Sequence, residues 1–369
     1  MLVDSFYFTE TQKNDADFSL PNVSDMPASF FHLTDAELEE FSRSQKSIDM
    51  VFAGTGDNVV AKRKQITDFI HSLTQDIKVV IADYSTLEFY SSATWREFRV
   101  DAFLDNTIDI RGHVTIHTYR DGEFCRAVTL GMTGFSLPEI SVARFPCSDQ
   151  NAFANLVNTV AQTLVENPVM GNDSTLIISL KKIKNKKLRE FLLTTTKDNA
   201  LLTASVKLKA VRPEEGDNSW SQLLIAFESP DYSSPQEQAN KTVADLFGAE
   251  ESYTIAKHDD ELLQASENAK RRLPTLRTLF NKGLAPGYSI MVKKPFETAN
   301  GNEWMWIEVT QWEGEQMTGI LQNDPYEIPD LKAGAVVIFS ESEVFDYILN
   351  KPDGTSEGNE TGKILERRE

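Results

Sequence analysis

The spacing of hydrophobic residues changes from strand-like to helix-like and back again within the first 85 residues. Apolar side chains dominate 48–54 and 77–84, which predicts two buried strands. Between them, residues 62–75 repeat apolar side chains at helical spacing and are predicted to form an amphipathic helix. The polar residues 1–45 are expected to pack as an arm on a neighbouring domain. Within the arm, Thr34 is expected to cap a short helix through a capping box.

A meander of strands is predicted next. Residues 113–120 and 124–132 flank Asp121-Gly122, a strong signal for a hairpin turn. A third strand is predicted at 139–145. Residues 151–166 then form an amphipathic pattern that Asn167-Pro168 should end, because the residue before a proline avoids helical geometry.

Strands and helices continue to mix after residue 173. Strands are predicted at 176–183, 204–211 and 220–227, and helices at 187–193 and 236–248. Because strands and helices do not alternate regularly, the sequence indicates an α+β protein with mixed or antiparallel sheets and flanking helices. This stretch, 173–256, is either a second α+β unit or continuous with the first unit at 46–172.

The last unit, 257–369, begins with a long helix at 258–282 that Pro274 is expected to kink or divide. From Tyr288 the pattern is strand-rich, which predicts a small, barrel-like C-terminal domain with flanking helix. The residues after Lys351 are polar and rich in glycine at first.

Three segments of this unit carry a resemblance to a known family. They are GYSIMVKKPFE, NEWMWIEVTQWEG and TGILQNDPYEIPDLKAGAVVIFSESEVFDYIL. In this order they resemble the bacterial "domain of unknown function 2314" family over about 286–350. The resemblance implies a small strand-rich bacterial domain without an established activity, often attached to other modules, with some members in settings suggestive of toxin immunity. Gly334-Ala335 departs from the Gly-Asp that such domains often have.

The composition and net charge of the chain make some classes of binding partner less favourable than others. The chain has 369 residues and a formal net charge of −19, which repels phosphate backbones and anionic lipid headgroups. We therefore expect neither a nucleic acid nor a membrane as partner. The sequence has neither a signal peptide pattern nor an apolar run of membrane-spanning length. Two cysteines, Cys125 and Cys147, are too few for a disulfide framework and are expected to be reduced thiols in a cytoplasmic protein.

The tryptophan-rich segment 304–312 is the strongest candidate for a binding surface. Alternate side chains of a strand point to opposite faces, so Met305, Ile307 and Val309 should share one face. The opposite face is predicted to carry Trp304, Trp306, Glu308, Thr310 and Trp312. This face either anchors a partner, as tryptophan often does at interfaces, or packs under the preceding helix or against the middle domain.

Other candidates have weaker signals. Asn323 and Asp324 lie in an Asn-Asp-Pro turn, where they either present a carboxylate to a ligand or form the turn itself. His113 and His117 are four residues apart, and in a strand their side chains would be about 13 Å apart, too far to share an ion. No metal site is therefore predicted. The partner-binding candidates are Trp304, Trp306, Glu308, Trp312, Asn323 and Asp324.

Signatures of catalysis and of cofactor binding are weak. Gly54-Thr55-Gly56 lacks the further residues of a phosphate-binding loop. No nucleophile elbow is present, and no cofactor is predicted. One basic cluster is concentrated enough to consider as an anion site, although an exposed positive face explains it better. It consists of Lys181, Lys182, Lys184, Lys186, Lys187 and Arg189.

These observations favour a protein that binds another protein and is not an enzyme. The leading hypothesis is a cytoplasmic immunity protein that occludes a cognate bacterial toxin, and a basic toxin domain would be attracted to the acidic surface. One alternative is an enzyme of unassigned chemistry with a cleft between the middle and C-terminal domains. Another is a scaffold or regulatory docking module.

Overall fold

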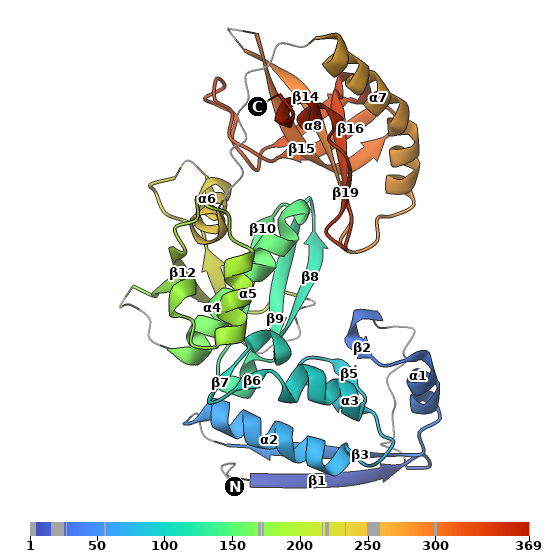
Figure 1. The fold of residues 1–369 in the computed structure, drawn as a ribbon, viewed down its shortest axis with the longest axis vertical. Coiled ribbons are helices and arrows are strands. Elements are labelled where there is room, and N and C mark those ends of the chain that lie inside the picture. Colours follow the sequence, from blue (N-terminus) through green and yellow to red (C-terminus); the bar gives the residue numbers. More distant parts are fainter. Residues whose placement is uncertain are drawn as a thin grey trace.

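The computed structural model describes most of the chain. The described residues are 5–15, 26, 28–54, 57–168, 171, 173–215, 217, 221–232, 234–248, 259–298 and 301–368. Three units follow one another along the long axis of the molecule, here named the N-terminal unit (5–100), the middle unit (103–248) and the C-terminal unit (259–368) (Figure 1). Helices and mixed or antiparallel sheets occur in all three units, which confirms the α+β prediction.

The N-terminal unit is built around a two-stranded ribbon. Its strands are β1 (Ser5–Gln12) and β3 (Lys46–Ala53), which pair antiparallel. Phe6 and Phe52 stack at 4.9 Å between ring centres, and both contact Phe69 of α2. Further elements are η2 (Ala28–Phe30), β2 (Phe31–His32), α1 (Asp35–Ser42), α2 (Val59–Thr74), β4 (Ile81–Asp83), β5 (Glu88–Tyr90), α3 (Ser92–Trp95) and the π-helix η3 (Arg96–Val100).

Sequence predictions for this unit were partly right. The capping box at Thr34 and Glu37 is confirmed. Of the two strands predicted to be buried, the first forms but is exposed, and the second is shorter than predicted. β3 is largely exposed because it pairs only with β1 among the described residues, and 77–84 contributes only the short strand β4.

The middle unit contains one six-stranded sheet in the order β11-β12-β13-β10-β9-β8. Strands from before and after residue 172 therefore share one sheet, and β10 and β13 are its parallel pair. Helix α4 carries nine buried residues and packs into the core of this sheet. The strands are β8 (Thr115–Asp121), β9 (Phe124–Leu130), β10 (Glu139–Phe145), β11 (Thr175–Ser179), β12 (Thr203–Val211) and β13 (Gln222–Ala226).

The helices and short strands of the middle unit surround this sheet. They are β6 (Phe103–Leu104), β7 (Thr107–Ile108), η4 (Ile110–Gly112), η5 (Met132–Phe135), η6 (Cys147–Asp149), α4 (Gln150–Glu166), η7 (Leu180–Lys182), α5 (Lys186–Thr194) and α6 (Pro235–Phe247). The hairpin predicted at Asp121-Gly122 is confirmed, and Gly122 has the positive φ (61°) that this turn requires. The helices predicted from 151, 187 and 236 are confirmed within a few residues.

The C-terminal unit packs helix α7 (Asp260–Asn281) against a six-stranded antiparallel sheet in the order β17-β16-β15-β14-β18-β19. No closed barrel is recorded among the described residues. The strands are β14 (Ser289–Thr298), β15 (Gly301–Glu313), β16 (Gln316–Leu321), β17 (Val336–Ser340), β18 (Asp346–Asn350) and β19 (Ser356–Gly358), with η8 (Glu341–Glu343) and α8 (Glu360–Glu366) beside them. The polar tail thus contains a strand and a helix.

The prediction that Pro274 would divide the long helix was wrong. α7 runs without interruption through Pro274. Leu273 and Leu276 are buried on either side of it in the core of the sheet, whereas Pro274 itself is exposed. Packing therefore holds the helix together, and water can satisfy the backbone carbonyl that the proline leaves without a partner. None of the helices in the described residues is both long and apolar enough to span a bilayer.

Candidate functional site

The tryptophan-rich strand β15 contains a β-bulge that reverses part of the predicted pattern. Val309 pairs with Gly319, but Gln311 pairs with Thr318, so Thr310 is an extra residue in β15. Trp312 consequently points to the same side as Met305, Ile307 and Val309 and belongs to their core. The prediction that Trp312 shares a face with Trp304 and Trp306 was wrong, because one inserted residue shifts the alternation.

Trp312 is a structural residue. Its side chain is 3% exposed, packs against Phe280 of α7 at 6.1 Å between ring centres, and donates a hydrogen bond from Nε1 to Glu341 Oε2 at 3.1 Å. This arrangement satisfies the indole N–H while burying the ring.

Trp304 and Trp306 do lie on the face opposite that core, together with Glu308. Both tryptophans are half-buried. Trp304 contacts the ring of Phe345 at 4.2 Å, and the ammonium of Lys293 lies 5.6 Å from the ring centre of Trp306. Both of these contacts lie within the C-terminal unit.

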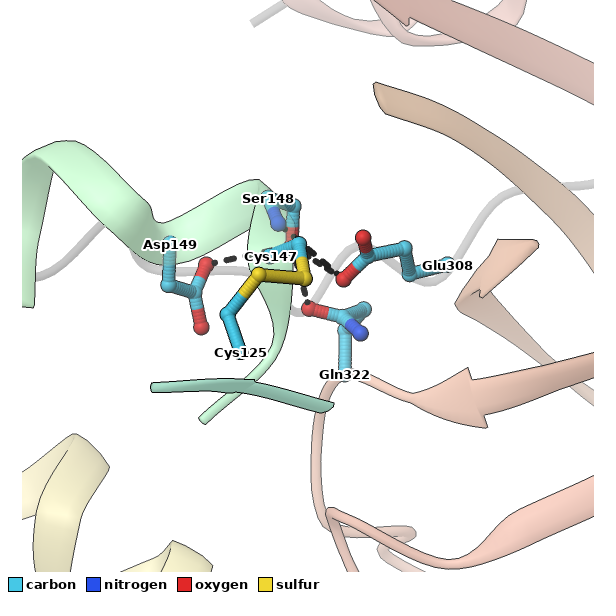
Figure 2. The surroundings of a disulfide bond; sticks show 6 residues. All are labelled: Cys125, Cys147, Ser148, Asp149, Glu308 and Gln322. Carbon is cyan, nitrogen blue, oxygen red and sulfur yellow. Dashed lines mark hydrogen bonds between the residues drawn. A yellow bond between two sulfur atoms is a disulfide. The ribbon is translucent and has the colours of Figure 1, made fainter. Parts of the chain in front are cut away.

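Glu308 joins the C-terminal unit to the middle unit. Its side chain is fully buried, and its Oε2 accepts hydrogen bonds from the backbone N–H and the hydroxyl of Ser148, at 3.0 and 3.1 Å. Ser148 belongs to η6 at the end of β10, and its hydroxyl also lies 3.0 Å from Gln322 Oε1 (Figure 2). Gln322 Nε2 donates to the carbonyl of Ile320, which fixes the orientation of the amide.

This junction contains more acceptors than donors. The Ser148 hydroxyl has one proton, but it faces Glu308, Gln322 and, at 3.4 Å, Asp149 Oδ1 (Figure 2). Glu308 Oε1 is buried without a hydrogen-bond partner among the described residues. Burial, followed by the charge of Glu308, raises the pKa of Asp149 to about 7. Burial also raises the pKa of Glu308.

A disulfide bond between Cys125 and Cys147 borders the junction (Figure 2). The prediction of two reduced thiols was wrong. Cys125 faces Phe145 across the antiparallel β9–β10 pair, and Cys147 follows two residues later, so the two Cα atoms are 5.1 Å apart. A sequence separation of 22 positions hid this proximity in the sequence. The bond ties the start of η6, and thereby Ser148, to β9.

Asn323 and Asp324 lie at the start of the loop after β16, with a bend at Asn323. Asp324 Oδ1 accepts a hydrogen bond from the backbone N–H of Ala333 at 2.9 Å, which closes the loop between β16 and β17. Asp324 is exposed and Asn323 is half-buried. The carboxylate of Asp324 thus stabilises a loop, and this loop reaches the middle unit at Gly334, next to Gln236.

The remaining sequence candidates have structural contacts of their own. His113 is fully buried and contacts the carbonyl of Arg99 through Nε2, whereas His117 lies in β8 beside Phe30. Within the basic cluster, Lys186 pairs with Glu190. Thr55 and Gly56 of the glycine loop lie outside the described residues. In the part of the chain that the structure describes, no group of three or more His, Cys, Asp or Glu side chains could hold a metal ion.

A cavity of about 360 Å³ lies between the middle and C-terminal units. Its walls are mostly apolar, and its charged lining residues are Arg144 and Glu228. Ala333 and Gly334 of the C-terminal unit close one side. The sequence predicted a cleft between these two domains as part of the enzyme alternative, but it did not indicate which residues would line it.

A second cavity, of about 680 Å³, lies in the N-terminal unit between β3, α2 and 79–85. A buried ionic network that the sequence did not reveal borders it. Arg63 donates to Asp83 Oδ2 at 2.9 Å and to His113 Nδ1 at 3.1 Å, while Arg99 pairs with Asp83 and Glu88.

The charges of this network stabilise one another. Burial alone would raise the pKa values of Asp83 and Glu88. Arg63 and Arg99 instead hold the pKa of Asp83 well below its ordinary range, and His32 and Arg99 lower that of Glu88 to about 2. Burial, helped by both arginines, lowers the pKa of His113 well below its usual value. The members come from separate segments without a common motif, so no local signal could have found them.

Residues 259–367 match a family model described as "Uncharacterized protein conserved in bacteria (DUF2314)". The C-terminal unit matches the DUF2314 family. The match confirms the resemblance seen over about 286–350 and extends it to α7 and α8. It covers nearly the whole C-terminal unit and lies outside the N-terminal and middle units. No curated protein and no solved structure matches the chain.

Proposed function

We propose that the protein acts by binding another protein, and that its N-terminal unit supplies the contact surface. The observation that carries this proposal is the concentration of exposed large apolar side chains in this unit. Among the described residues, eight of the eighteen such side chains precede residue 85. They are Tyr7, Phe8, Ile48, Val51, Leu73, Ile77, Val79 and Tyr84, here named the N-terminal apolar set.

The arrangement of this set suits a partner with an extended or convex element. Tyr7 and Val51 are 59% and 41% exposed and face each other across the ribbon. Val51, Val79 and Tyr84 line the cavity of about 680 Å³. Within the described residues the ribbon consists of β1 and β3 alone, so each strand offers an edge to which a further strand can pair.

The proposed form of this binding is immunity. The protein would occlude a cognate bacterial toxin in the cytoplasm, and a basic toxin domain would be attracted by the net charge of −19. A cytoplasmic location would place the Cys125–Cys147 bond in a reducing environment, where disulfides are rare.

The test compares two surface variants. Val51→Asp/Tyr84→Asp places charges in the N-terminal apolar set, and Tyr326→Asp/Ile338→Asp does the same on exposed apolar residues of the C-terminal unit. Wild type and the C-terminal variant should protect cells that express the cognate toxin and should co-purify with it, whereas the N-terminal variant should lose both properties. Equal protection by both variants would refute the assigned surface. Failure of the wild type to protect or to form a complex would refute immunity.

The enzyme alternative finds no specific support at the cavity between the middle and C-terminal units. That alternative predicts converging carboxylates or histidines, but the described lining contains one carboxylate, Glu228, and no histidine. The scaffold alternative differs from immunity in its partner, which would be an abundant cellular protein. Identification of the protein that the wild type captures distinguishes the two.

A further inference from the structure

The cavity between the middle and C-terminal units arises where two parallel strands separate. β10 and β13 pair from Glu139–Gln222 to Ser141–Leu224, and the pairing then stops. Beyond this point β13 continues towards Glu228, while β10 departs from a regular strand between Val142 and Phe145. The gap thus opens at the carboxyl ends of a parallel pair, a position where open sheets commonly bind ligands.

A bulge in β10 places Arg144 at this gap. The register against β9 shifts between Val142 and Phe145, and Arg144 has a φ of 58°, in the left-handed region that side chains with a Cβ rarely adopt. Bulges often redirect a side chain beside a functional site, and such strain persists only where the surroundings impose it. The result is an exposed arginine at the rim of an apolar cavity.

The guanidinium of Arg144 contacts an aromatic ring but forms no ion pair with a carboxylate among the described residues. Its central carbon lies 4.7 Å from the ring centre of Phe124, so the aromatic face orients the group. No carboxylate in the described residues forms an ion pair with Arg144. Glu228, the carboxylate that lines the same cavity, pairs with Lys209 instead. In a protein with a net charge of −19, this unpaired cation gives the cavity a local attraction for an anion.

The walls of the cavity indicate what the rest of the ligand should be. Rings and aliphatic groups line it, with Phe153 of α4 and Ala239 of α6 among them. The closing wall comes from the C-terminal unit, where Asp324 holds the N–H of Ala333 and where a Cβ on Gly334 would lie 3.0 Å from Gln236 Cβ. The volume of about 360 Å³ falls within the range of small-molecule pockets, which are typically apolar with few polar anchors.

We propose that this cavity binds a small monocarboxylate with an apolar body, the carboxylate on Arg144 and the body between the separated strands β10 and β13. One guanidinium matches one carboxylate in a bidentate pair. A dianion such as a phosphate monoester would leave a charge without a partner beside Glu228. This inference is independent of the proposed protein-binding surface in the N-terminal unit.

Calorimetric titration with three eight-carbon probes tests the proposal. Octanoate carries one carboxylate, 1-octanol is its uncharged counterpart, and octanedioate carries a second charge. Octanoate should bind saturably and about tenfold or more tightly than either of the others, because a charged hydrogen-bonded pair is worth at least that factor. Arg144→Gln should reduce octanoate affinity to the level of octanol. Absence of saturable octanoate binding by the wild type, or equal binding by Arg144→Gln, overturns the proposal.

A second pair of variants separates ligand binding from stability. Arg144→Gly removes both the cation and the left-handed strain, so the melting temperature should rise while octanoate binding is lost. Ser174→Gly is the matched control, because Ser174 is exposed, has a φ of 64° and does not line the cavity. It should gain similar stability and retain octanoate binding. If Arg144→Gly binds octanoate as well as Ser174→Gly does, Arg144 is not the anchor and the proposal fails.

Discussion

At the contact between the middle and C-terminal units, the hydrogen bonds and the pKa of single residues depend on residues of the other unit. Glu308 was predicted as a partner-binding residue, and its partner is Ser148 of the same chain. Asp149 had no sequence signal, since it is one of many acidic residues. Its pKa of about 7 depends on burial and on Glu308, which is 159 residues away in the sequence. No local pattern could indicate such a pair.

Asp149 should make stability depend on pH. Its pKa rises from an ordinary 3.8 to about 7 on folding. Between these values the unfolded chain releases a proton that the folded protein retains, so the contribution of Asp149 to the free energy of unfolding should fall as the pH rises from 4 to 7. Asp149→Asn should flatten this slope and raise stability at pH 8 by roughly 1–3 kcal/mol, measured by urea unfolding. The exposed Asp330→Asn should leave the slope unchanged, and an unchanged slope in Asp149→Asn would contradict the assignment.

Elements with a strong period and clear ends could be predicted from the sequence. The hairpin at Gly122 and helix α4 are examples, because turn chemistry and amphipathic spacing are local. Elements decided by packing could not. The continuity of α7 through Pro274 depends on leucines buried against a sheet, and the bulge at Thr310 depends on the register with β16. Neither feature has a local signature.

The bulge in β15 predicts opposite outcomes for two neighbouring tryptophans. Trp312→Ala should cost about 3–5 kcal/mol, because it empties a core position under α7. Trp306→Ala should cost about 1 kcal/mol, because its ring is half-buried on the other face. Denaturant unfolding of both variants measures the difference. Equal costs would mean that the strand alternates regularly and that the two tryptophans share a face.

At the scale of the whole molecule, the middle and C-terminal units are joined through a covalently fixed turn. The Cys125–Cys147 bond holds η6 against β9, and Ser148 in this turn holds Glu308 and Gln322. The hairpin of β8 and β9 adds a second connection, in which Gln311 Nε2 donates to Glu123 Oε1 at 2.6 Å. Redox conditions should therefore affect the contact between the units as well as the stability of the middle unit.

Reduction of the disulfide should lower the free energy of unfolding by about 3 kcal/mol, the value for a closed loop of this length. It should also increase amide hydrogen exchange at 147–150 and around Glu308, since Ser148 is less firmly held. Mass spectrometry with and without reductant measures both regions. The double variant Cys125→Ser/Cys147→Ser should respond to reductant in neither respect. If reduction changes the middle unit but not the Glu308 region, the bond does not support the connection.

The hydroxyl and N–H of Ser148, 160 residues earlier in the chain, donate hydrogen bonds to Glu308, whose carboxylate is shielded from solvent. A substitution at Ser148 therefore affects Glu308, and a substitution at Glu308 affects Ser148, so neither unit can change its side of the contact independently. A gene rearrangement that separated the middle unit from the C-terminal unit would expose the Glu308 carboxylate and the apolar walls of the nearby cavity to solvent. Lineages that keep both the middle and the C-terminal units should change the contacting residues in step.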